Sequence, residues 1–118
     1  ADLRGYVGKE ELADLYRRAA CVVLPTRYEG FGLTVLEAMA SGTPVVAAPD
    51  RAVREVAGEV VVYAERHRLA DGIRRALADA SRLSAAGLER ARAFSWEETA
   101  RRTLAVYLDV LRAAEKVR

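Results

Sequence analysis

Apolar and polar positions in the first half of the chain alternate between two patterns. Residues 9–20 form the first amphipathic stretch, with charged side chains on one side of a predicted helix. Its apolar side chains recur at helical spacing and are Leu12, Leu15, Tyr16 and Ala19. Residues 21–24 then form an apolar run that ends at Pro25, as in a strand buried on both faces. A helix that leads directly into such a strand indicates a parallel sheet, because parallel strands need a long crossover between them.

The same alternation continues to about residue 64. The expected strands are short and apolar, and they cover residues 3–7, 21–24, 45–48 and 59–63. The expected helices lie between them and cover residues 9–20, 33–41 and 51–57. Gly42 is expected to end the second helix, since glycine tolerates the left-handed conformation that follows many helices. The first strand is the weakest of the four because Arg4 and Gly5 interrupt its apolar pattern.

The second half of the chain predicts helices alone. One apolar stripe recurs at helical spacing through Leu69, Ile73, Ala76, Leu77 and Ala80. Ser95 and Glu98 have the spacing of a capping box and predict the start of a last helix. The stripe of that helix runs through Trp96, Ala100, Leu104, Tyr107 and Leu111. We therefore expect one α/β domain over residues 1–118, with a βαβαβαβ core over residues 1–64 and helices over residues 65–118.

Composition restricts the class of protein. The 118 residues are 52% hydrophobic and 31% charged, which is typical of a soluble globular domain. Lys and Arg number 19 against 17 Asp and Glu, and the net charge of +2 is spread along helices, so a nucleic-acid partner is not indicated. The single cysteine, Cys21, falls in an apolar run, which fits a reducing, cytoplasmic setting. No apolar run reaches the roughly 18 residues that a membrane span needs, and the first residues lack the pattern of a signal peptide.

The densest group of unusual residues lies at 25–44, after a predicted strand and at the start of a helix. In an open parallel α/β sheet, ligands bind at this edge, beyond the carboxyl ends of the strands. Gly30 and Gly32 let the backbone approach a ligand closely, and the free N–H groups of the helix that begins near Leu33 favour an anion such as a diphosphate. A dinucleotide fingerprint would need a third glycine where Val35 stands, so a nicotinamide cofactor is poorly supported.

Two acidic residues flank these glycines. Glu37 lies one helical turn inside the helix, where its carboxylate could reach the hydroxyls of a ribose beside the anchored phosphates. Glu29 precedes the turn and would face whatever extends beyond the phosphates. The residues alone also allow a second interpretation, in which both side chains are solvated surface groups, as most acidic residues are.

The spacing of these residues resembles that of one family of enzymes. Seven residues separate Glu29 from Glu37; Gly-Phe-Gly-Leu follows the first, and Glu37 begins the run Glu-Ala-Met-Ala-x-Gly-x-Pro-Val-Val. This pattern is similar to that of retaining GT-B glycosyltransferases of family 4, also called glycosyl transferases group 1. Further matches, spread over essentially the whole chain, are Gly5-Tyr6-Val7, Glu11-Leu12, Leu15-Tyr16, Val23-Leu24-Pro25 and Phe94-Ser95-Trp96.

The resemblance implies a fold and a role for each of these residues. The domain would be a Rossmann-like, three-layer parallel sheet of about four strands, followed by C-terminal helices. Glu37 would bond the ribose of a nucleotide diphosphate sugar, the donor substrate, and Glu29 would contact the transferred sugar or the face where it leaves, as the catalytic residue. The remaining contacts to the sugar and the diphosphate would come from Gly30, Phe31, Gly32, Leu33 and Thr34. No cofactor and no metal are implied, since family members stabilise the leaving diphosphate with backbone dipoles and a basic pair.

The chain departs from the family pattern at two places. The basic pair lies in Gly-Arg and Lys-Gly segments upstream of the region matched here, and neither segment occurs in this chain. Arg27, next to the loop, could supply positive charge, although an exposed loop arginine is the simpler interpretation. The turn over residues 63–67 is also shorter than in family members, and His67 is expected to be exposed to solvent rather than catalytic.

The resemblance places residues 3–7 at the third strand of the Rossmann-like domain. In the strand order 3-2-1-4-5-6, the two preceding strands would lie between residues 3–7 and residues 21–24, so we expect an exposed sheet edge at residues 21–24, open to a partner chain or to a second copy. We expect the donor-binding part of a bacterial, cytoplasmic glycosyltransferase, which transfers a hexose to a hydroxyl acceptor with retention. It would be incomplete without an acceptor domain, through which a longer parent could also associate with a membrane.

Two alternatives stay open at this point. The chain could be a non-catalytic nucleotide-sugar-binding or assembly module that works with a partner chain. It could also be a folding unit in which the glutamates and glycines are purely structural, and such a unit would bind no nucleotide.

Overall fold

Three short parallel strands carry the fold in the computed structural model, which describes residues 1–116. They are β1 (Val22–Leu24), β2 (Val45–Ala47) and β3 (Val62–Tyr63), paired in that order. Each crossover passes through a helix, since parallel strands cannot be joined by a tight turn. The crossover helices are α2 (Leu33–Ala40) and α3 (Arg51–Ala57). The register confirms the predicted parallel sheet, with Val22 opposite Val45 and Val46 opposite Val62.

The other helices follow the predicted order with one division. They are α1 (Lys9–Arg18), the short 3₁₀ helix η1 (Arg66–Arg68), α4 (Leu69–Ala78), α5 (Ala80–Ala91) and α6 (Trp96–Lys116). The apolar stripe predicted over residues 69–80 is divided at Asp79, whose backbone leaves the helical region. Aspartate competes with helix hydrogen bonding through its side chain. Here the Asp79 carboxylate accepts a hydrogen bond from Arg82 at 2.6 Å, and the Asp79 carbonyl accepts the Leu83 N–H at 3.0 Å in the next helix.

Residues 3–7 do not form the predicted fourth strand. They run without regular structure, and the Leu3 and Tyr6 side chains are 94% and 97% exposed. A strand exists only through its pairing, and within residues 1–116 β1 pairs with β2 alone. β1 is accordingly half-buried, whereas β2 is fully buried. The exposed sheet edge expected at residues 21–24 is therefore present.

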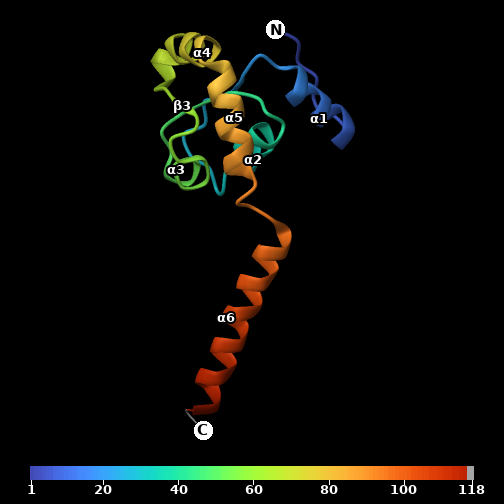
Figure 1. Cartoon of the computed structure of the whole chain (residues 1–118), viewed down its shortest axis with the longest axis vertical. Helices are drawn as coiled ribbons and strands as arrows, with labels where there is room; N and C mark the ends of the chain where they lie inside the picture. Colours follow the sequence, from blue (N-terminus) through green and yellow to red (C-terminus); the bar gives the residue numbers. More distant parts are fainter. Residues whose placement is uncertain (117–118) are drawn as a thin grey trace.

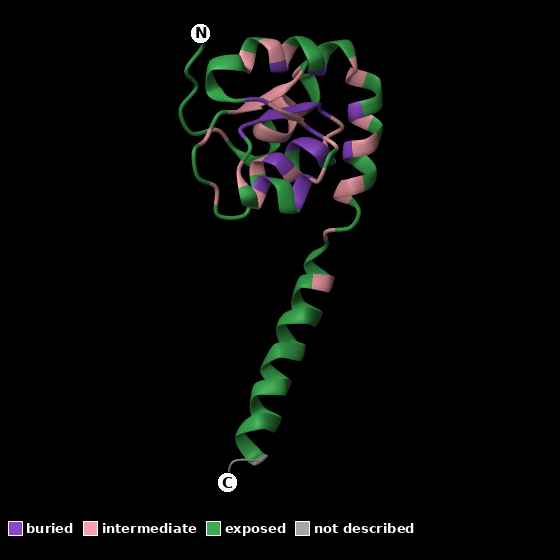
Figure 2. Cartoon of the chain, turned by 90° about the vertical axis from the view of Figure 1, so that its left-hand side faces the viewer, coloured by how far each residue is buried: buried purple, intermediate pink, exposed green. Residues whose placement is uncertain are grey.

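β2 lies at the centre of the core. Its side chains alternate between the two faces of the sheet, as the strand geometry requires. Val45 and Ala47 pack with buried residues of α2 and α3 that include Val35, Met39, Val53 and Val56. Val46 packs on the other face with Ala64, Ala76 and Leu83. Helices thus cover both faces of β2, which confirms the three-layer arrangement and explains why this stretch has no polar position (Figure 2).

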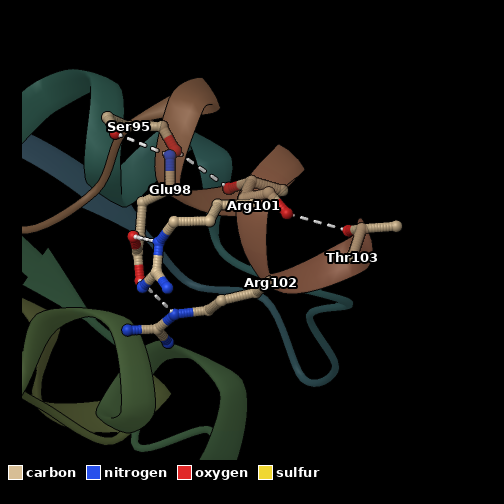
Figure 3. A network of polar contacts seen from close by, with 6 residues as sticks. Ser95, Glu98, Arg101, Arg102 and Thr103 are labelled. Carbon is tan, nitrogen blue, oxygen red and sulfur yellow. Dashed lines mark hydrogen bonds and ion pairs between the residues drawn. The ribbon is translucent and has the colours of Figure 1, made fainter. Parts of the chain in front are cut away.

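α6 extends away from the rest of the chain (Figure 1). The Ser95 hydroxyl accepts a hydrogen bond from the Glu98 N–H at 3.1 Å, as the capping box predicts. The Glu98 carboxylate turns to Arg101 and Arg102, and their hydrogen bonds lower the pKa of Glu98 to about 2 (Figure 3). The apolar stripe of α6 faces solvent, and its Trp96 is 80% exposed. No helix within residues 1–116 combines the length and apolar character that a membrane crossing requires.

Gly72 sets how closely α4 approaches the sheet. A β-carbon added there would lie 2.8 Å from the Ala64 β-carbon and 2.8 Å from a Val46 methyl group. Overpacking a core costs about 1–3 kcal/mol, against about 1 kcal/mol gained when alanine replaces a helical glycine. We expect Gly72→Ala to lower the free energy of unfolding by about 1 kcal/mol net. Urea denaturation of the variant and the wild type measures this difference in the free energy of unfolding.

Gly87→Ala is the matched control for this substitution. Gly87 also lies inside a helix, but its added β-carbon would meet the flexible Met39 side chain at 3.4 Å. We expect the stability of Gly87→Ala to equal or slightly exceed that of the wild type. Equal stability of the two variants would show that α4 does not pack as tightly as described.

Candidate functional site

The predicted site lies where the chain leaves β1 and enters α2. Residues 25–32 connect the two elements at the carboxyl end of the strand, the edge at which ligands bind in parallel sheets. Gly32 is buried and has φ of 95°, a left-handed conformation that residues with a β-carbon rarely adopt. This turn places the start of α2 near the carboxyl ends of the strands.

The first turn of α2 has no side-chain cap. Gly32 occupies the N-cap position and has no side chain that could accept the free N–H groups. α3 differs in this respect, because its Asp50 carboxylate accepts the N–H groups of Ala52 and Val53 at 2.8 Å and 3.4 Å. The uncapped N–H groups and the helix dipole at α2 therefore favour an external anion.

The other predicted site residues surround this helix start. Gly30 is exposed, Leu33 is half exposed and Thr34 is half-buried. Phe31 packs edge-on against Phe94, with ring centroids 6.4 Å apart. Glu29 is half-buried beside the turn, with its Cγ 3.9 Å from where a β-carbon on Gly32 would stand. The fold thus brings the predicted residues together at one edge.

Glu37 is held by a residue whose polar group sequence analysis missed. The Tyr16 hydroxyl of α1 donates a hydrogen bond to the Glu37 Oε2 at 3.0 Å. Burial and the Glu37 carboxylate together raise the pKa of Tyr16 to about 12, while a hydrogen bond from Thr34 acts in the opposite direction. The pattern placed Tyr16 on an apolar stripe, but a tyrosine there usually needs a polar partner for its hydroxyl. This need for a polar partner is the signal by which the sequence could have indicated a contact of the Tyr16 hydroxyl.

Thr43 makes a second hydrogen bond to Tyr16, this time to its backbone. It is 4% exposed, and its hydroxyl donates to the Tyr16 carbonyl oxygen at 2.6 Å. α1 is thereby attached to the α2 crossover at two points, Glu37 within α2 and Thr43 beyond its end. The Glu37 carboxylate, although exposed, has a defined position.

Two depressions flank the loop. One, of about 230 Å³, is lined mostly by apolar side chains together with Glu37, and includes Phe31, Leu36, Phe94 and Trp96. The other, of about 420 Å³, lies beyond the ends of all three strands and is lined by polar side chains that include Arg27 and His67. His67 is exposed, as predicted. Within residues 1–116, no three His, Cys, Asp or Glu side chains are arranged to hold a metal ion.

Comparison with known proteins gives consistent matches. Residues 1–79 match the family described as glycosyl transferases group 1. The chain is 47% identical over 105 residues to D-inositol 3-phosphate glycosyltransferase 1 of Catenulispora acidiphila, covering 82% of this chain and 25% of that protein. It is 38% identical over 109 residues to O-antigen chain mannosyltransferase B of Escherichia coli, covering 87% of this chain and 29% of that protein.

A solved structure is similar over most of the chain. Sucrose-phosphate synthase from Thermosynechococcus elongatus superposes with a TM-score of 0.82 and 35% sequence identity. The match covers 93% of this chain and 30% of that chain. The chain thus spans less than a third of the length of each of these three proteins.

The Tyr16 hydrogen bond predicts an observable titration. Removing the Glu37 charge removes an interaction that favours the neutral phenol, so Glu37→Gln should lower the pKa of Tyr16 from about 12 toward the ordinary value. Ultraviolet absorbance of tyrosinate as a function of pH measures this. The titration curve should contain a step at high pH that belongs to Tyr16, and Tyr16→Phe identifies this step because it should then disappear. An unchanged high-pH step in Glu37→Gln would contradict the contact.

Proposed function

The chain belongs to the family of glycosyl transferases group 1, and on that premise we propose that residues 29–37 bind a nucleotide diphosphate sugar. The observation that carries the proposal is the uncapped start of α2, which follows a glycine turn at the ligand-binding edge of the sheet. Its N–H groups suit the diphosphate. Glu37, one turn further and beside an apolar depression, suits the ribose next to a nucleoside base.

Each site residue then has a distinct task. The N–H groups of Gly30, Phe31 and Gly32 bind sugar hydroxyls and the distal phosphate, and Leu33 and Thr34 complete the cradle. Glu29 precedes the turn and contacts the transferred sugar. The hydrogen bond from Tyr16 holds the Glu37 carboxylate in position for the ribose hydroxyls.

The proposed reaction is transfer of a hexose to a hydroxyl acceptor with retention of configuration. Backbone dipoles at α2 stabilise the charge that develops on the departing diphosphate, without a metal. The chain spans about a quarter of the relative from Catenulispora, so acceptor binding belongs to a further domain or chain. A reducing, cytoplasmic location is part of the proposal, since Cys21 is the single cysteine of the chain and forms no disulfide within it.

The second candidate is a non-catalytic nucleotide-sugar-binding or assembly module. The unpaired edge of β1 and the exposed stripe of α6 favour it, because both surfaces suit a partner chain or a second copy. Hydrolysis of a sugar nucleotide by the chain alone, or transfer of its sugar, would exclude this candidate.

Nucleotide binding is the direct test of the donor site. We expect at least one of UDP, GDP and ADP to bind saturably in calorimetric titrations, because the diphosphate and ribose contacts lie within this chain. Glu37→Ala should weaken that binding about tenfold or more, since it removes a charge-assisted hydrogen bond to the ribose.

Glu115→Ala is the matched control for the titration. It removes the same charge from an exposed position on α6 and should leave nucleotide affinity unchanged. Equal loss of affinity in both variants would indicate a non-specific effect. Absence of binding for all three nucleotides would reject donor recognition by this chain.

Glu29 has a separable prediction because its proposed contact is to the sugar. For the nucleotide that binds, Glu29→Gln should leave the affinity for the free diphosphate within about twofold and reduce the affinity for the corresponding sugar nucleotide about tenfold. Parallel titrations with the two ligands measure the difference. Equal weakening of both ligands would place Glu29 at the diphosphate instead.

A further inference from the structure

Three arginines line the larger depression at the carboxyl edge of the sheet. Arg27 follows β1, Arg51 begins α3 after β2, and Arg66 begins η1 after β3. They lie far apart in the sequence and meet only because parallel strands end at one edge. The depression has a volume of about 420 Å³, which falls within the range of small-molecule sites.

These three guanidinium groups have no ion-pair or hydrogen-bond partner within residues 1–116. Every other arginine in that range contacts a carboxylate or a backbone carbonyl oxygen. The chain has 17 Asp and Glu residues, and it uses many of them to pair arginines within helices. Most arginines of this surface are paired, so three unpaired guanidinium groups at one depression are a local exception.

The charge around the depression is positive after its acidic residues are counted. Asp50 and Glu65 also line it. The Asp50 Oδ1 accepts the N–H groups at the start of α3, but the carboxylate keeps its charge, so three guanidinium groups and two carboxylates leave a net charge of +1 around the depression. Arg51 is the first residue of α3, where the positive end of the helix dipole disfavours a cation. A bound anion would remove that unfavourable interaction.

We propose that this depression binds the phosphate group of a phosphorylated sugar or polyol. Guanidinium groups bind phosphate oxygens through paired charge-assisted hydrogen bonds, and a phosphate monoester carries between one and two negative charges near pH 7. The volume leaves room for the sugar beside the phosphate. This site is separate from the start of α2 and draws on side chains rather than on backbone N–H groups.

Calorimetric titration of the whole chain with glucose 6-phosphate tests the site. We expect saturable binding that weakens at least tenfold in the triple variant Arg27→Gln, Arg51→Gln, Arg66→Gln, which removes the three guanidinium groups. The control triple variant Arg82→Gln, Arg92→Gln, Arg112→Gln loses the same charge from ion-paired helix surfaces and should bind as the wild type does. Circular dichroism confirms that both variants fold.

Further ligands and one further variant distinguish this phosphate site from the proposed donor site. Glu37→Ala should leave glucose 6-phosphate binding unchanged even where it abolishes nucleotide binding, so failure of the donor site and failure of this site are separate results. Inorganic phosphate should compete with glucose 6-phosphate, whereas UDP should not. Absence of glucose 6-phosphate binding, equal losses in both triple variants, or competition by UDP would each overturn the proposal.

Discussion

Parallel pairing of β1 with β2 is the constraint on which the rest of the structure depends. The Val22 N–H donates to the Pro44 carbonyl at 2.8 Å, and the Ala48 N–H donates to the Leu24 carbonyl at 3.0 Å, so the two strands begin and end together. The chain must then leave β1 at one edge, cross through α2 and start β2 from the other end. Repeating this at β3 brings three loops of distant sequence to a single edge. Both anion sites proposed here lie on that edge.

The attachment of α1 to α2 determines how well the proposed donor site around Glu37 is ordered. α1 has no fully buried residue, so apolar packing alone holds it weakly. Its Tyr16 compensates with two polar contacts, one from the buried Thr43 hydroxyl and one to Glu37. The hydrogen bond from the Tyr16 hydroxyl both helps to hold the helix and orients the Glu37 carboxylate. Stability and positioning therefore have a common cause at this point, and substitutions at Tyr16 affect both.

The elements that sequence predicts well are those whose signals are local. The helix over 51–57, the end of α2 at Gly42 and the cap at Ser95 depend on near neighbours in the chain, and all three are confirmed. Residues 3–7 failed as a strand because a strand needs a neighbour, which local pattern cannot supply. The glycine loop was placed correctly for the same local reason, whereas the gathering of Arg27, Arg51 and Arg66 depends on topology and was not predicted.

The two anion sites differ in physical kind, and the difference suits different tasks. N–H groups at the start of α2 are fixed by the fold, so they need no reorganisation when charge develops on a leaving diphosphate. Arginine side chains at the rim are long and exposed, and salt screens them strongly. Their planar guanidinium groups match phosphate oxygens in pairs, which suits them to recognising a fully charged phosphate. On the proposed function, backbone dipoles thus serve the leaving group, and the arginines recognise a separate phosphate group.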